Sequence, residues 1–290
     1  MAKFSEKIFS FWRNLNAVQR KHNSVKKYLL KNYGNIIAEF KNRSVLPLAK
    51  GDVAYPVWVC WWQGAEAMPP LVRACYNSLR KNADGHPVHL LTKNNYKQFV
   101  ALPEYILEKT ERGIITVTHL SDILRAELLY RYGGLWLDAT VLVTSPLPDF
   151  AGQELFSLKR VKDNDYVAES RWSAYLFYLT KGHLLADFLR KMFAQYWQTE
   201  NNLIAFFLID YCIALAYEQI PAVRAALDAC PYNNPEAHTL QRQLGTEYNM
   251  QEWQRLLLSG QFHKLTWKKE FAAEVNGRQT FYGWLLEKYT

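Results

Sequence analysis

The sequence predicts an α/β fold: a mostly parallel central sheet flanked by helices, with a helical C-terminal half and an amphipathic N-terminal helix. Three observations predict it. Strand-like and helix-like segments alternate between residues 57 and 143, helical patterns dominate 183–258, and residues 1–50 carry a basic, helical pattern. With 290 residues, 49% of them hydrophobic, the chain can bury a full core as one large domain or two small ones.

The N-terminal segment, residues 1–50, contains most of the net charge. It holds eleven Lys and Arg against two acids, a balance of +9, whereas the rest of the chain has a balance of −1. Basic residues largely occupy the helix faces opposite a set of apolar residues at helical spacing: Phe4, Ile8, Phe11, Trp12, Leu15 and Val18. Such a helix either docks on its own domain or lies on an anionic membrane surface, and the sequence leaves both open.

Several classes of protein are disfavoured. The basic residues are not spread over the folded body, and no nucleic-acid-binding module is recognisable, so we expect no nucleic-acid partner. The first residues lack the apolar core and cleavage site of a secretion signal. The most apolar run, 203–217, contains Asp210 and is shorter than the about 20 residues that a membrane span needs. We therefore expect a cytoplasmic protein, either free or peripheral on the inner face of the plasma membrane.

The predicted elements follow a linker at 41–56, closed by Gly51 and Pro56, and we divide the chain within this linker into an N-terminal helical segment, 1–50, and a main domain, 51–290. Before residue 144 we expect strands at 57–62, 88–92, 114–118 and 135–143, and helices at 69–82, around 95–109 and at 121–132. After the helical region we expect a strand at 261–267 and a helix at 280–289. Open α/β sheets bind ligands at the carboxyl ends of their strands.

The segment SDILRAELLYRYGGLWLDAT, 121–140, places charges where a core would need apolar residues. Ser121 suits the helix N-cap. Helical periodicity places Asp122 and Arg125 beside Ala126 and Leu129, so both should face inward or into a cleft.

The strand after this helix also carries an inward charge. Alternation puts Trp136, Asp138 and Thr140 on one face, and Gly133 and Gly134 allow the sharp turn before them. An unpaired buried carboxylate would cost several kcal/mol, so Asp138 must meet a cation, a cluster of donors or a polar ligand. A purely structural ion pair with the preceding helix satisfies this as well as a binding site does.

These residues resemble a known family. Ser-Asp-x-x-Arg, then Leu-Tyr-x-x-Gly-Gly-x-x-x-Asp, is similar to the donor-sugar region of family 32-type glycosyltransferases, and the ending Trp136–Thr140 resembles the bacterial capsular polysaccharide synthesis branch. The likeness covers most of 55–270. It implies a GT-A-like, Rossmann-type fold, a nucleotide-sugar donor and retention of anomeric configuration. It divides the domain into a nucleotide-sugar-binding part, 51–160, and a mainly helical acceptor-side part, 161–290.

The resemblance also implies roles for single residues. Asp122 and Arg125 match the pair that holds the hydroxyls of the donor sugar, and Asp138 matches the first carboxylate of the Asp-x-Asp motif; these three are the candidate catalytic residues. Trp62 matches the aromatic residue that stacks on the base. The remaining candidate donor-binding residues are Gln63, Gly64, Gly134, Thr140, Lys264 and Lys268.

The sequence departs from the family pattern at Thr140, which replaces the second Asp of Asp-x-Asp. A neutral hydroxyl is a poor ligand for Mn²⁺ or Mg²⁺, so dependence on a divalent cation is an open question. His263 either completes a metal site with Asp138 or is an ordinary surface residue. Lys264 and Lys268 are alternatives that would replace a metal at the leaving diphosphate.

The function that these features predict is a glycosyltransferase that adds a sugar from a nucleotide-sugar donor to a growing capsular or other cell-surface polysaccharide, or to its lipid-linked precursor. Glu169 and Asp210 remain candidates for an enzymic nucleophile. Two alternatives from other classes stay open. One is a non-catalytic saccharide-binding or assembly subunit with a degenerate site, and the other is a membrane or nucleic-acid adaptor that depends on residues 1–50.

Overall fold

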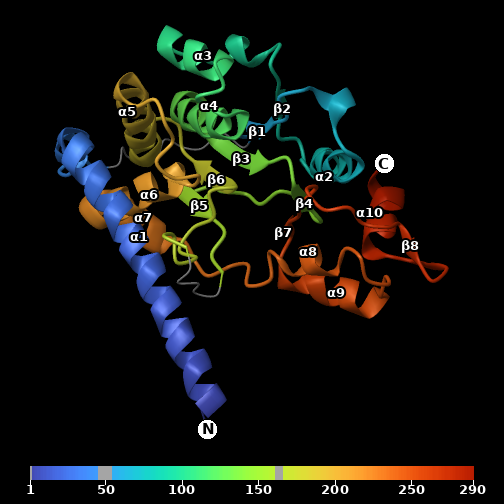
Figure 1. The fold of residues 1–290 in the computed structure, drawn as a ribbon. Helices are drawn as coiled ribbons and strands as arrows, with labels where there is room; N and C mark the ends of the chain where they lie inside the picture. The colour runs from blue at the N-terminus through green and yellow to red at the C-terminus, as the bar shows by residue number, and fades with distance from the viewer. Residues whose placement is uncertain (1, 45–53, 161–165) are drawn as a thin grey trace.

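A computed structural model describes residues 2–44, 54–160 and 166–290, with side chains from residue 16 onward (Figure 1). Its helices are α1 (Ala2–Phe40), α2 (Pro70–Lys81), α3 (Glu104–Glu111), α4 (Val117–Tyr132), α5 (Leu184–Thr199), α6 (Leu208–Gln219), α7 (Pro221–Ala229), α8 (Thr239–Gln243), α9 (Met250–Ser259) and α10 (Phe281–Tyr289). Its strands are β1 (Val57–Cys60), β2 (Val88–Leu91), β3 (Gly134–Asp138), β4 (Val141–Val143), β5 (Leu155–Ser157), β6 (Leu176–Leu179), β7 (Phe262–Lys264), β8 (Glu274–Val275) and β9 (Arg278–Gln279). Short 3₁₀ turns cover Ala65–Ala67 and Tyr96–Gln98.

The central sheet has five strands in the order β2-β1-β3-β6-β5. Strand β1 pairs in parallel with β2 and β3, whereas β6 pairs antiparallel with β3 and β5. Strands β2, β1, β3 and β5 therefore run in one direction, and β6 alone opposes them. The predicted α/β fold class, with a mostly parallel central sheet, is confirmed.

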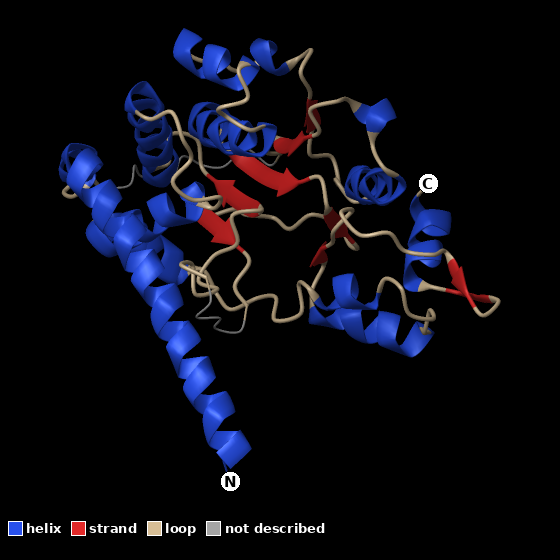
Figure 2. Cartoon of the chain, in the orientation of Figure 1, coloured by secondary structure: helices blue, strands red, loops and turns tan. Residues whose placement is uncertain are grey.

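Helices cover both faces of this sheet (Figure 2). Trp58, Trp136 and Phe177 on one face share a core with α1 and α3 to α7. Leu135 and Leu137 on the other face pack with α2 and β4. The alternation along β3 predicted from the sequence is thus confirmed, because neighbouring residues of an extended strand point to opposite faces.

The second half of α1 belongs to the body of the protein. Leu29, Tyr33 and Phe40 are fully buried against α5 and α6, and Lys26 pairs with Glu218 at 2.7 Å. Docking on the domain, one of the two alternatives for this segment, holds for this half of the helix. The apolar residues between Phe4 and Leu15, which suggested membrane contact, lie outside the described side chains, as does most of the predicted linker at 41–56.

Three predicted elements need correction. Residues 114–118 do not form a strand: Thr116 caps α4, its hydroxyl accepting from the backbone N–H of His119 at 3.2 Å. Ser121 therefore lies inside the helix and is not its cap. The cap hydrogen bond and the packing of α4 outweigh the β propensity of this stretch, which is a weak preference.

The predicted strand at 135–143 is divided in two. The chain turns after Asp138, and β4 leaves the central sheet to pair antiparallel with β7, with Val141 opposite Lys264. This second pairing brings a segment more than 120 residues away along the chain to the end of β3.

Candidate active site

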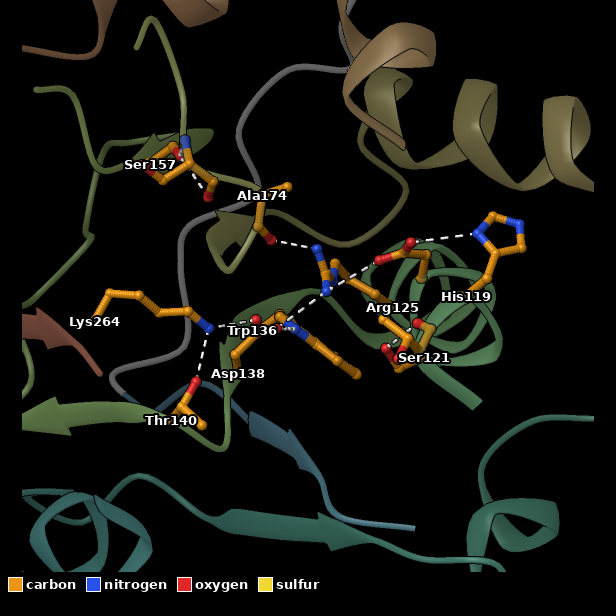
Figure 3. Close-up of polar contacts among 12 residues, drawn as sticks. His119, Ser121, Arg125, Trp136, Asp138, Thr140, Ser157, Ala174 and Lys264 are labelled. Atoms are coloured by element: carbon orange, nitrogen blue, oxygen red, sulfur yellow. Dashed lines mark hydrogen bonds and ion pairs between the residues drawn. The ribbon is translucent and has the colours of Figure 1, made fainter. Parts of the chain in front are cut away.

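The polar side chains predicted to face inward meet at the carboxyl end of β3, where the parallel strands of the sheet end together (Figure 3). Asp138 is the last residue of β3, and Cys60 at the end of β1 lies opposite it in the register. Helix α4 lies over the same sheet face and supplies Asp122 and Arg125, which are 7% and 5% exposed. The predicted inward orientation of both residues is confirmed.

Arg125 connects the helix to the strand. One Nη2 atom lies 3.2 Å from a carboxylate oxygen of Asp122 and 3.2 Å from Oδ1 of Asp138. Its Nη1 donates to the backbone carbonyl of Ala174, and the guanidinium lies over the Trp136 ring at 4.8 Å. A planar guanidinium with several fixed donors suits such a junction, because it satisfies partners in different directions from a single plane.

Lys264 approaches Asp138 from the opposite side (Figure 3). Its ammonium donates to Oδ2 of Asp138 at 2.8 Å and to the hydroxyl oxygen of Thr140 at 2.7 Å. The β4–β7 pairing fixes this approach, since it places the lysine opposite Val141.

The carboxyl group of Asp138 is therefore held in its charged form. Burial alone would raise its pKa, but the charges of Lys264 and Arg125 and the hydrogen bonds from Lys264 and Trp136 hold this pKa below its ordinary value. The side chain remains 31% exposed, so an ionised carboxylate with fixed orientation is accessible at the end of the sheet.

Asp122 has a second partner that the sequence interpretation missed. Nδ1 of His119 lies 3.3 Å from Oδ2 of Asp122, and the imidazole is buried against Phe193 and Trp197. The spacing of three residues on one helix face was the available signal. Asp122 does not act at the N-terminus of this helix, because α4 begins more than one turn earlier.

Trp62 follows β1 at the same edge of the sheet. It is half-buried and packs on Tyr96 with ring centroids 5.2 Å apart. Gln63 is exposed, and Gly64 has a φ of 92° with open space around it, so this turn presents backbone and an aromatic face at the strand ends. This placement suits the predicted contact with a base.

Two candidate donor-binding residues do not join this cluster. Gly134 lies at the amino end of β3, the opposite end from Asp138, and a Cβ there would lie 2.1 Å from the carbonyl oxygen of Pro56. Its φ of 94° and this contact show that glycine is needed for packing, which corrects the donor-binding assignment. Lys268 lies in the exposed segment after β7.

The residues do not fit a divalent cation held by the turn after β3. The Lys264 ammonium occupies the space between Asp138 and Thr140, where a cation would bind. His263 is fully buried on the other side of β7 beside Trp253, and burial lowers its pKa to about 4. It is neither a surface residue nor a partner for Asp138, which corrects both alternatives. The described part of the chain has no cluster of three or more His, Cys, Asp or Glu suited to a metal.

Asp210 is a further carboxylate near these charges. It lies in the first turn of α6 and accepts a hydrogen bond of 2.8 Å from the indole of Trp172. Burial is the main cause that raises its pKa, to about 6, and the negative charges of Asp122 and Asp138 add to this effect against Arg125. The thiol of Cys60, opposite Asp138 in the register, is not a candidate nucleophile, because burial raises its pKa to about 12.

Comparison with known proteins identifies the family. The model of the family described as capsular polysaccharide synthesis protein matches residues 5–285. The chain belongs to this family. The match includes most of α1, so the family model covers this helix as well as the α/β body.

Two curated relatives are similar to part of the chain. O-glycosyltransferase braB of Annulohypoxylon truncatum is 34% identical over 92 residues, which cover 29% of this chain and 22% of the relative. O-glycosyltransferase PaGT of Phomopsis amygdali is 31% identical over 102 residues, covering 32% and 25% of the two chains. The family member described here thus matches about a quarter of the length of these relatives.

Two solved structures align with most of this chain at low scores. The PaToxG glycosyltransferase aligns with a TM-score of 0.42 and 13% identity, covering 85% of this chain and all of that one. The bifunctional glycosyltransferase WbbM aligns with a TM-score of 0.46 and 11% identity, covering 86% and 51%. At these scores the fold assignment depends on the sheet topology described above.

Among the described residues, no helix combines the length and the apolar composition that a membrane span requires.

Proposed function

We propose that this protein is a glycosyltransferase that moves a sugar from a nucleotide-sugar donor to a capsular or other cell-surface polysaccharide, or to its lipid-linked precursor. The observation that carries the proposal is the junction at the end of β3, where Arg125 and Lys264 hold an accessible, charged Asp138. A polyhydroxyl ligand needs such fixed acceptors and donors, and membership of the capsular polysaccharide synthesis family supports a sugar as that ligand.

Donor binding would use the ends of β1 and β3 together with helix α4. Trp62 after β1 offers an aromatic face for the base, and Asp122, Arg125 and Asp138 offer hydrogen-bonding partners for ribose and sugar hydroxyls. Charged partners in fixed positions cost little reorganisation when the substrate reaches its transition state. The more deeply buried pair of Asp122 and Arg125 would also fix the orientation of Asp138, which is the most exposed of the three.

The reaction would be a front-face displacement with retention of configuration. The bond between C1 of the sugar and the diphosphate oxygen breaks, and its electron pair remains on the diphosphate. The acceptor hydroxyl oxygen forms the new bond to C1 on the same face. Its proton passes to the departing diphosphate oxygen, so that no enzymic nucleophile is required.

The N-terminal segment suits a membrane-associated acceptor. The basic balance of residues 1–50 favours the inner face of an anionic membrane, where lipid-linked saccharides are elongated, so we place the protein in the cytoplasm at that surface. We propose no nucleic-acid partner, because the positive balance is confined to this segment.

The test is release of nucleoside diphosphate from a panel of nucleotide sugars, followed by chromatography with and without saccharide acceptors. An enzyme releases the diphosphate slowly even without an acceptor, and NMR of a transfer product would show the anomeric configuration of the donor preserved. Donor binding without any release would instead support the binding-subunit alternative that Thr140 raises.

A further inference from the structure

We propose that the ammonium of Lys264 takes the place of a divalent cation, so that this transferase binds and releases its nucleoside diphosphate without a metal. The inference rests on the proposed function and concerns how the same site handles the charge of the leaving group. It starts from a disagreement between the family motif, which provides a second carboxylate for a metal, and the residues at the end of β3.

The ammonium of Lys264 lies between Asp138 and Thr140. Lys264 Nζ lies 2.8 Å from Oδ2 of Asp138 and 2.7 Å from Oγ1 of Thr140, so the cationic nitrogen bridges the first and third residues of the motif. Those are the two side chains between which a metal would be held. A metal there would have to displace a paired ammonium and accept a neutral hydroxyl as a ligand, which hard cations bind poorly.

Lys264 is held in position by its neighbours. The lysine is 18% exposed, and its ammonium also lies 5.0 Å from the ring of Tyr175. Its backbone N–H donates to the carbonyl of Ala237 at 2.7 Å, and the next residue, Leu265, donates to the carbonyl of Thr140 at 2.8 Å. These backbone hydrogen bonds hold the Cα of Lys264 in place, so the ammonium is carried by a fixed strand position and not by a flexible surface loop.

Asp122 and Asp138 balance the charges of Arg125 and Lys264, and of these two cations Lys264 is the more exposed, at 18% against 6%, so its ammonium is the one next to the open edge. Arg160 contributes a further positive charge on this side. Burial is the main cause that lowers the pKa of His238, which lies beside Tyr175, and the charges of Arg160 and Lys264 lower this pKa further. A diphosphate that gains an electron pair when the glycosidic bond breaks is stabilised by such a preorganised cation.

Thr140 has a defined part in this arrangement. Its hydroxyl oxygen accepts from the ammonium at 2.7 Å, whereas a carboxylate at this position would add a negative charge to a junction in which acids and bases already balance. Thr140 and Lys264 therefore act together. The neutral Thr140 leaves the positive charge of Lys264 available to the leaving diphosphate.

The experiment measures binding of UDP, GDP and CDP by calorimetry in EDTA and again with Mn²⁺. We expect the nucleotide that binds wild-type protein to bind equally well, within about twofold, in both. Lys264→Met should weaken it about tenfold or more, because a charge-assisted hydrogen bond is lost. Lys264→Arg, which keeps the charge, should recover part of the affinity and shows that the loss is electrostatic if Lys264→Met folds poorly.

The matched control is Lys81→Gln, which removes an exposed lysine at the end of α2, beside the amino end of β2 and so away from the site. The variant Thr140→Asp with Lys264→Met restores a carboxylate pair and should bind the nucleotide only with Mn²⁺. Metal-independent binding by this variant at the wild-type level would overturn the inference.

The outcomes separate the two proposals. Binding by wild-type protein that disappears in EDTA and returns with Mn²⁺ would refute the role of Lys264 and leave the glycosyltransferase proposal standing. Binding in EDTA that Lys264→Met does not weaken would refute it equally. If none of the nucleotides binds under any condition, the proposed function fails, and this inference fails with it.

Discussion

Two aspartates, Asp138 and Asp187, are each held by two basic side chains, yet the surroundings of the two carboxylates differ. Asp187 in the first turn of α5 is 4% exposed and pairs with Arg43 at 3.0 Å and Arg190 at 2.9 Å. Asp138 is 31% exposed at the end of a strand.

The buried Asp187 and its two arginines tie the end of α1 to α5, and a negative charge in the first turn of α5 also suits the helix dipole. Asp138 and its basic partners connect no two helices in this way, and the carboxylate stays accessible. Ion pairing alone therefore does not mark a site. The distinguishing feature is a paired charge that stays accessible at the carboxyl edge of a sheet.

The largest expected effect is on transfer in Asp138→Asn. The amide keeps the size of the side chain but loses the charge that orients Lys264 and Arg125. We expect a loss of about a hundredfold or more in the rate of nucleoside diphosphate release. The melting temperature should change by only a few degrees, because the residue is partly solvated. Turnover at the wild-type rate would remove Asp138 from the proposed site.

The next effect is on stability in Asp187→Asn. Losing this carboxylate leaves two arginines without their partner, but both are partly exposed and can be hydrated, so the free energy of unfolding should fall by about 2 kcal/mol. Urea unfolding measures this. Nucleotide affinity of the folded variant should stay within about twofold of wild type, and a large loss of affinity would contradict the division between the two regions.

The effect of the charge at Asp210 depends on pH, because the partner of this carboxylate is the indole of Trp172 and not a cation. Its pKa in the folded protein is raised to about 6 from an ordinary value of 3.8, so the folded state holds this proton more tightly. The stability due to this group is present below pH 3.8 and is lost as the pH rises through about 6.

Asp210→Asn removes that charge while its amide oxygen still accepts from Trp172. The variant should therefore unfold at higher urea than wild type at pH 7.5, and the difference should vanish near pH 4. A difference of equal size at both pH values would show that the carboxyl charge is not the cause.

The central part of the site could be predicted from the sequence because two local periodicities determine it. Helical spacing puts Asp122 and Arg125 on one face, and strand alternation puts Asp138 on the face that meets them. The same rules failed at element ends: Thr116, and not Ser121, caps α4, because cap choice depends on which residue can bond the free backbone N–H groups in the folded context.

The partner of Asp138 from the distant β7 segment could be named but not positioned. His263 and Lys264 are adjacent, so only one of them faces the site, and the register between β4 and β7 decides which. That register depends on long-range pairing, which leaves no local signal. Gly134 was misassigned for a related reason, since its contact with Pro56 arises only when β1 and β3 are paired.

The most direct test of the account is the thermal shift that a panel of nucleotide sugars causes in wild type, Asp138→Asn and Asp187→Asn, all in EDTA. A ligand that binds the folded state raises the apparent melting temperature according to its affinity and concentration. We predict that one donor shifts wild type and, from a lower starting point, Asp187→Asn by the same amount, and that it does not shift Asp138→Asn. An equal shift in all three proteins would contradict a donor site at the end of β3.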